Sequence, residues 1–276
     1  HPTPDTRHPT PDTRHPTPLR TPPELHVKIA VCLKRVPDTE MRFGIAPDGK
    51  SVDATGLKFE ISTFDEYAVE AALQLNEAHP PGEVTVVGLG PDALGEQLRR
   101  ALAMGADRAM HLTVDEPPFD ALAIATALAA ELKDGGFDLI LFGRNATDTG
   151  TGAVGSMTAE LLGLPCVTAV SHLEIQGSEG TARRELEGAT ATVAFSLPAV
   201  LTIDEGIARP RIAGLKGIMA AKKKPMDVRP ASLGPVTVVV DRLALPPERQ
   251  AGRIVGEGPD AVPELVRLLH DEAKAI

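Results

Sequence analysis

Residues 138–164 read DLILFGRNATDTGTGAVGSMTAELLGL, and this stretch decides the fold. It begins with an apolar run at 139–142, long enough for a buried strand and too short for a typical helix. A loop rich in glycine and threonine follows, and apolar residues then recur at helical spacing from 154 to 161. Strand, glycine-rich loop and helix predict an anion cradle, because glycines allow close approach and the first helical turn offers free N–H groups.

The loop does not follow a standard nucleotide-binding motif. It contains no GxGxxG sequence, and no GxxxxGK[ST] sequence either, because no lysine precedes a serine or threonine there. A glycine-rich turn between a strand and a helix also occurs as a plain connection. Taken alone, the loop therefore leaves both interpretations open.

Net charge, cysteine usage and the length of apolar runs argue against a nucleic-acid-binding protein, a disulfide-bonded protein and a membrane protein. A formal net charge of −10 argues against nucleic-acid binding, because phosphate contacts need clustered lysine and arginine, and residues 222–224 form only one small basic cluster. Cys32 and Cys166 form no CxxC motif and no metal spacing, which favours a reducing cytoplasm. No stretch reaches the roughly 18 apolar residues of a membrane helix, so we expect no membrane insertion.

The chain is expected to have three parts. Residues 1–26 carry two copies of HPTPDTR and a truncated third, and this proline-rich tail is predicted to be disordered. Residues 27–221 alternate apolar strands with amphipathic helices, which predicts an α/β domain with a doubly wound, mostly parallel sheet and helices on both faces. The β-prone stretches between 166 and 195 predict a β-hairpin that completes the sheet.

The third part, 222–276, is predicted to be an arm that lies on another surface, with a lone strand at 236–240 and a final helix at 260–275. The preceding segment, 204–217, contains enough glycine and proline to be a loop. Its apolar residues Ile207, Ile212 and Leu215, with Ile218 just beyond, are either buried by the domain or exposed as a partner anchor.

Ligands of open parallel sheets bind at the carboxyl ends of the strands. This rule selects the loop after residue 33, the loop around 89–90 and the loop at 143–154. Ser62 or Thr63 is expected to cap the helix that begins beside them. Together these segments predict a nucleotide-binding cleft.

Six collinear stretches together resemble the β subunit of electron transfer flavoprotein. The resemblance covers about residues 27–276. Its stretches are KIAVCLKRVPDTE at 28–40, STFDEYAVEAALQL at 62–75, RRALAMGADRAMHL at 99–112, DLILFGRNATDTGTGAVGSMTAELLGLP at 138–165, SLPAVLTIDEGIARPRIAGLKGIMAAKKK at 196–224, and the closing helix.

The resemblance implies an adenine nucleotide alpha hydrolase-like fold and a heterodimer with an α subunit. In that family the β subunit holds AMP in a structural role, and FAD lies mainly in the α subunit. The pair is an electron carrier rather than a complete enzyme. It takes electrons from flavoprotein dehydrogenases, such as the acyl-CoA dehydrogenases of fatty acid β-oxidation, and passes them to a membrane quinone oxidoreductase.

The resemblance also implies residue roles. Phe64 would approach the flavin ring, Leu215 would anchor partner dehydrogenases, Glu185 would influence domain orientation, and the arm would wrap the α subunit. The cofactor-binding residues it implies are Cys32, Ser62, Thr63, Phe64, Asp65, Leu89, Gly143, Arg144, Asn145, Ala146, Thr147, Asp148, Thr149, Gly150, Thr151, Gly152, Ala153 and Val154.

The sequence departs from the family in the nucleotide loop. The family pattern AIDxDxxQxG is replaced by ATDTGTGAVG at 146–155, so the second acidic residue and the glutamine are absent. Two alternatives stay open: an electron-bifurcating, NADH-dependent relative with a second FAD in place of AMP, and a stand-alone adenine-nucleotide sensor.

Overall fold

The computed structural model describes residues 27–248 and 251–276, which form two compact units. The larger unit contains the described residues up to Arg42 together with Ala54–Val240. The smaller unit consists of Phe43–Asp53 and Asp241–Ile276. The proline-rich tail predicted for residues 1–26 lies outside the described residues.

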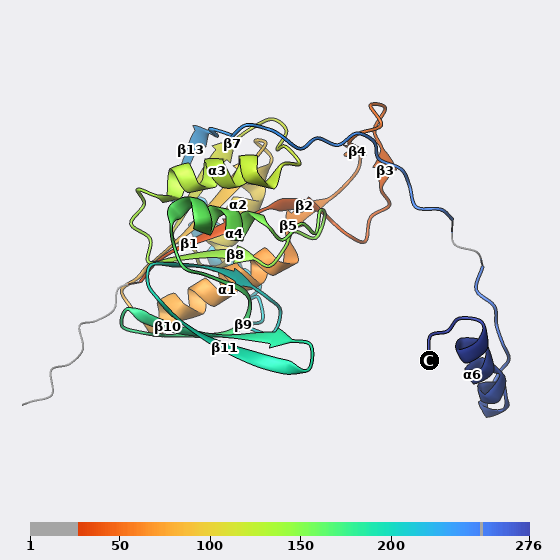
Figure 1. Cartoon of the computed structure of the whole chain (residues 1–276). Coiled ribbons are helices and arrows are strands. Elements are labelled where there is room, and N and C mark those ends of the chain that lie inside the picture. Colours follow the sequence, from red (N-terminus) through yellow and green to blue (C-terminus); the bar gives the residue numbers. More distant parts are fainter. Residues whose placement is uncertain (1–26, 249–250) are drawn as a thin grey trace, which may run out of the picture. The chain divides into compact units, whose positions relative to one another are not determined.

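One nine-stranded sheet forms the centre of the larger unit in the part of the chain that the structure describes (Figure 1). Its order is β11-β10-β9-β12-β8-β1-β6-β7-β13. The pairs β11–β10 and β10–β9 are antiparallel. All neighbouring strands in the rest of this order, from β9 through β12 to β13, are parallel. The strands are β1 (Lys28–Leu33), β6 (Glu83–Gly90), β7 (Arg108–Thr113), β8 (Leu139–Gly143), β9 (Cys166–Gln176), β10 (Glu179–Leu186), β11 (Ala189–Ser196), β12 (Ala199–Ile203) and β13 (Met226–Pro230).

Helices cover both faces of the sheet, which confirms the predicted doubly wound α/β fold. Successive residues of a strand point to opposite faces, and accordingly Ile29 and Val31 pack in one core cluster, while Ala30 and Cys32 pack in the other. The first cluster contains residues of α1 (Thr63–Ala78), α2 (Leu94–Met104) and α5 (Leu215–Ala221). The second contains residues of α3 (Ala121–Leu132) and α4 (Val154–Leu162).

The β-prone stretches after residue 166 extend the sheet as predicted, although as three antiparallel strands rather than a simple hairpin. Two short strands of the larger unit, β2 (Arg35–Pro37) and β5 (Phe59–Ile61), form a separate antiparallel ribbon. This ribbon leads directly into α1 and places the start of that helix close to the end of β1.

Two predictions after residue 204 are wrong. The expected loop at 204–217 ends at Gly214, because α5 begins at Leu215. The expected lone strand at 236–240 is absent, and the strand of this region is β13, which pairs with β7. The β-branched residues there form no ladder because the N–H groups of Thr237 and Val238 donate to the carboxylate of Asp120 instead.

Lys224 holds the chain just before β13 against the end of α2. Its ammonium group donates to the carbonyl oxygens of Leu102, Gly105 and Ala106 at 3.1, 3.1 and 2.6 Å, at and just after the end of α2. This contact holds the chain at the edge of the sheet, where the next residues pair with β7.

The smaller unit contains a two-stranded ribbon, β3 (Gly44–Ile45) with β4 (Val52–Asp53), a 3₁₀ turn η1 (Pro259–Ala261), and α6 (Val262–Asp271). Within this unit the N–H of Leu243 donates to the carbonyl of Gly49 at 2.8 Å. The final helix is therefore confirmed, with bounds narrower than the predicted 260–275.

Candidate functional site

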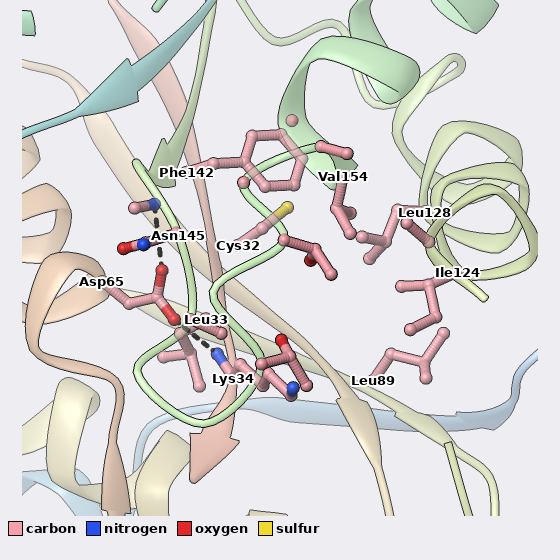
Figure 2. A pocket seen from close by; sticks show the side chains of 18 of the residues that line it. Cys32, Leu33, Lys34, Asp65, Leu89, Ile124, Leu128, Phe142, Asn145 and Val154 are labelled. Atoms are coloured by element: carbon pink, nitrogen blue, oxygen red, sulfur yellow. Dashed lines mark hydrogen bonds between the residues drawn. The ribbon is translucent and has the colours of Figure 1, made fainter. Parts of the chain in front are cut away.

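A pocket opens at the carboxyl ends of β1, β6 and β8, where the topology predicts a ligand (Figure 2). The loop after β8 and the first turn of α4 form one wall, and the segment before α3 forms another. The lining residues are Cys32, Leu33, Lys34, Asp65, Val87, Leu89, Pro117, Pro118, Phe119, Ala121, Ile124, Leu128, Phe142, Gly143, Arg144, Asn145, Ala146, Thr149, Thr151, Gly152, Ala153, Val154 and Gly155.

Asp65 connects three of the elements around the pocket. It lies in the first turn of α1, and only 6% of its surface is exposed. One carboxylate oxygen accepts a hydrogen bond from the N–H of Lys34 at 2.8 Å, and the other accepts from the N–H of Gly143 at 2.9 Å (Figure 2). The carboxylate therefore ties the ends of β1 and β8 to the start of α1.

Burial raises the pKa of Asp65 to about 7, and the two backbone hydrogen bonds limit that rise. Cys32 lies beside it at the end of β1, and burial, with a smaller contribution from the charge of Asp65, raises the pKa of the Cys32 thiol. The thiol is therefore protonated at neutral pH. Cys32 contributes a small apolar surface to the pocket rather than a nucleophile.

Gly143 permits the close approach of β8 to α1. A Cβ atom at this position would lie 2.4 Å from Asp65 Oδ1 and 2.8 Å from the backbone nitrogen of Asp65. Both distances are far below ordinary van der Waals contact. The glycine is therefore required by the geometry of the pocket floor.

The serine before α1 bonds to the loop after β8 rather than capping the helix. Ser62 occupies the N-cap position, yet its hydroxyl makes no capping hydrogen bond, so the predicted capping role is wrong. The hydroxyl instead accepts from the N–H of Thr147 at 3.3 Å and donates to the carbonyl of Asn145 at 3.5 Å. The Ser62 hydroxyl does not cap the helix because it bonds to backbone groups of this loop instead.

Two ion pairs fasten the same loop. Lys34 Nζ pairs with Asp148 at 2.8 Å, and Arg144 pairs with Asp204 at 2.9 Å. The guanidinium of Arg144 also lies over the ring of Phe64, 5.0 Å from its centroid. These contacts join the loop to β1, to the start of α1 and to the residue after β12.

The loop and α4 present a site suited to an anion. No side chain caps α4, whose N-terminal residues Ala153 and Val154 line the pocket, so the positive end of the helix faces the pocket. Gly152 adopts a φ of +59°, which allows the backbone to turn into that helix.

Two buried polar atoms of the loop have no partner within the described chain, namely Asn145 Oδ1 and Thr147 Oγ1. Buried polar atoms are normally hydrogen-bonded. Their orphaned state fits a site that a polar ligand or water completes.

The opposite side of the pocket is apolar. Figure 2 shows Leu89, Ile124 and Leu128 on the side away from Asp65, with Phe142 and Val154 closing the top of the view. An apolar slot beside an anion-binding helix terminus matches the two halves of a nucleotide, a flat base and a phosphate.

The structure brings together twelve of the eighteen predicted cofactor-binding residues. These line the pocket: Cys32, Asp65, Leu89, Gly143, Arg144, Asn145, Ala146, Thr149, Thr151, Gly152, Ala153 and Val154. The remaining six lie in the loop or at the start of α1 but outside the lining: Ser62, Thr63, Phe64, Thr147, Asp148 and Gly150.

Sequence reasoning missed the wall formed by residues 117–128. Pro117, Phe119, Ile124 and Leu128 line the pocket from the segment that follows β7 and from α3. The rule that selected the other loops, position at the carboxyl end of a parallel strand, applies equally to the segment after β7. That signal was sufficient to find this wall.

The two predicted partner-binding residues lie away from the pocket lining. Leu215 is 77% exposed and its neighbour Ile212 is 97% exposed, whereas Ile207 packs against the core. Glu185 lies on β10, where its carboxylate accepts hydrogen bonds from Ser171 at 3.3 Å and Thr190 at 2.8 Å. Of the apolar residues in this segment, Ile207 is therefore partly buried by the domain, whereas Ile212 and Leu215 are exposed as a partner anchor would be.

Among residues 27–248 and 251–276, no helix is long and apolar enough to span a membrane. Within the same residues, no group of three or more histidine, cysteine, aspartate or glutamate side chains could hold a metal ion.

Comparison with known proteins gives one consistent family. A family model described as "Electron transfer flavoprotein domain" matches residues 50–233. A curated "Electron transfer flavoprotein subunit beta" from Bacillus subtilis is 39% identical over 263 residues, which cover 91% of this chain and 100% of the relative. Proteins of the same name from Syntrophomonas wolfei and Homo sapiens are 39% and 37% identical, covering 86% and 87% of this chain and 92% and 96% of the relatives.

Proposed function

The chain belongs to the family of electron transfer flavoprotein β subunits, and on that premise we propose that it pairs with an α subunit as an electron carrier. In this proposal the pair takes electrons from flavoprotein dehydrogenases, including acyl-CoA dehydrogenases, and delivers them to a membrane quinone oxidoreductase. The redox group is an FAD shared with the α subunit. The pocket of this chain holds AMP in a structural role.

The observation that carries the proposal is the two-sided chemistry of the pocket. Leu89, Ile124 and Leu128 provide an apolar surface for an adenine ring. The start of α4 and the loop before it supply N–H groups and positive helix-dipole charge for one phosphate. Thr149 and Thr151 also line the pocket, and their hydroxyls are further donors.

The altered loop supports a small nucleotide rather than a metal-bound one. Where the family pattern has its second acid and its glutamine, this loop has Gly150 and Ala153, and the hydroxyls of Thr149 and Thr151 lie beside Gly150. Asp148 itself is paired with Lys34. The remaining polar groups suit a phosphate, which hydroxyl and backbone donors can bind without a cation.

FAD supplies the redox chemistry when bound, since its ring accepts and releases electrons singly. On this chain, Phe64 is the residue proposed to meet the ring. It lies in the first turn of α1, where Arg144 and Tyr67 contact its ring at 5.0 and 6.2 Å between the centres. These contacts favour a fixed orientation of the aromatic side chain.

Docking of dehydrogenases is proposed to use Leu215. Leu215 begins α5 beside Ile212, and both side chains extend into solvent. A few side chains that a partner covers completely contribute most of the binding energy at protein interfaces, and the proposal assigns Leu215 to that group.

The test is nucleotide content after co-expression with an α subunit. The complex is purified and denatured, and released FAD and AMP are quantified by chromatography. Equal amounts of FAD and AMP are the expected result.

The other outcomes identify the alternatives. Two FAD molecules without AMP would indicate an electron-bifurcating relative. A chain that purifies alone and without flavin would contradict the electron-carrier function and leave a nucleotide sensor.

A further inference from the structure

Asp120 lies between the pocket and the segment that follows β13. It precedes α3 as its N-cap, between Phe119 and Ala121, which both line the pocket. Its own side chain does not line the pocket, and only 2% of its surface is exposed.

Each carboxylate oxygen of Asp120 serves a different element. Oδ1 accepts from the N–H groups of Leu122 and Ala123 at 2.9 and 3.2 Å and so caps α3. Oδ2 accepts from the N–H of Thr237 at 2.6 Å, the hydroxyl of Thr237 at 2.8 Å and the N–H of Val238 at 2.9 Å. The hydrogen bonds from Thr237 hold the pKa of Asp120 well below its usual range, so the group is charged at all physiological pH values.

Segment 231–238 lies along α3 beyond this contact as well. The N–H of Gly234 donates to the carbonyl of Ala123 at 3.1 Å, and a Cβ at Gly234 would lie 2.8 Å from Thr126. Leu233 packs against the core cluster that contains Leu128 of α3. The backbone N–H groups of residues 231–238 that donate within the described chain all donate to Thr113, Asp120 or Ala123.

The same helix forms the apolar wall of the pocket. Ile124 and Leu128 line the pocket, and the residues before the helix, Pro117 and Phe119, line it too. Segment 231–238 is therefore bonded to α3, the helix that a bound adenine base would contact. The segment and the pocket wall thus share contacts with the same helix.

We propose that Asp120 is a positioning residue that couples segment 231–238 to the nucleotide pocket. The inference rests on the proposed function, since it assumes that the pocket holds AMP. While Asp120 accepts hydrogen bonds from Thr237 and Val238, residues 117–128 stay in the position that contacts the adenine base of AMP. Coupling between two sites is reciprocal, so bound nucleotide also tightens the segment.

The decisive variant is Asp120→Asn. Asparagine caps helices as well as aspartate does, so α3 keeps its cap. Its single carbonyl oxygen cannot also accept from the N–H groups of Thr237 and Val238. Its amide group can donate only to the Thr237 hydroxyl, so both backbone N–H groups lose their acceptor. The matched control is Asp134→Asn, which makes the same change at an exposed residue just after α3.

Dissociation of radiolabelled AMP is measured from the full chain in complex with its α subunit. We expect AMP to leave Asp120→Asn about tenfold faster than wild type, within the usual range for coupled sites, and to leave Asp134→Asn at the wild-type rate. Thr237→Val removes one of the three donors at an exposed site and is expected to give a smaller acceleration of the same kind. This milder variant decides the matter if Asp120→Asn does not fold.

Hydrogen exchange of the wild-type complex is a second readout. The amides of Thr237 and Val238 are expected to exchange several-fold more slowly with AMP bound than after AMP removal, an effect that a merely stabilising contact would not produce. The coupling would be overturned, with the nucleotide site intact, if AMP left Asp120→Asn and Thr237→Val at the wild-type rate. It would also be overturned if the amides of Thr237 and Val238 exchanged equally fast with and without AMP. A wild-type complex without AMP would overturn the proposed function and this inference with it.

Discussion

Replacing Gly143 with alanine tests the assembly of the pocket floor. The added Cβ would lie 2.4 Å from Asp65 Oδ1, so the carboxylate must move and release the N–H of Gly143, which it now accepts at 2.9 Å. Overpacking a tight site costs about 1–3 kcal/mol. Above the pKa of Asp65, where its carboxylate is charged, the lost hydrogen bond costs about a further 1.5–3 kcal/mol. We expect the free energy of unfolding to fall by about 3–5 kcal/mol.

Thermal unfolding of wild type and variant measures this loss. At roughly 2–4 °C per kcal/mol for a chain of this size, the melting temperature should fall by about 10 °C. AMP retention should fall with it, because Asp65 no longer holds the loop after β8 in place.

Two control variants separate this clash from other effects of adding a methyl group. Gly150→Ala lies in the same loop at a φ of +64° with open space around it. It should lose only the roughly 1–2 kcal/mol of a left-handed residue. Gly95→Ala lies in α2, also with open space, and should be neutral or stabilising. The reasoning is refuted if Gly143→Ala melts within a degree or two of wild type.

Three further predictions address the remaining parts of the site. Gly152→Val places a branched side chain at a φ of +59°, with its Cβ 3.2 Å from the carbonyl of Arg144, and should abolish AMP retention; full retention on chromatography would contradict the anion cradle. Leu215→Ala removes an exposed anchor worth about 2 kcal/mol or more, so reduction by a dehydrogenase at limiting concentration should slow roughly 30-fold with bound flavin unchanged; an unchanged rate would exclude that docking role. The raised pKa of Asp65, about 7 against 3.8, means that the folded state binds the proton more tightly, so this group's contribution to the free energy of unfolding declines as pH rises from about 4 through 7. In urea titrations the stability difference between wild type and Asp65→Asn should therefore shrink or reverse from pH 5 to 7.5, and a difference independent of pH would show that Asp65 titrates normally.

Local sequence patterns were sufficient for the elements and for one wall of the pocket. Alternating apolar strands and amphipathic helices encode which face of each element is buried, and the run at 138–164 contains its strand, loop and helix in sequence. The closing helix and the β-prone stretches after 166 were found in the same way. The individual cofactor-binding residues came from the family resemblance, and twelve of them line one pocket.

Tertiary structure alone decided the contacts between distant segments. Asp65 bonds to Gly143 across 78 positions, Ser62 to Thr147 across 85, and Asp120 to Thr237 across 117. A side chain of this kind satisfies whichever buried backbone N–H the packing brings to it, and no periodicity records that choice. For this reason β-branched residues at 236–240 form no strand, and Ser62 serves a loop rather than its own helix.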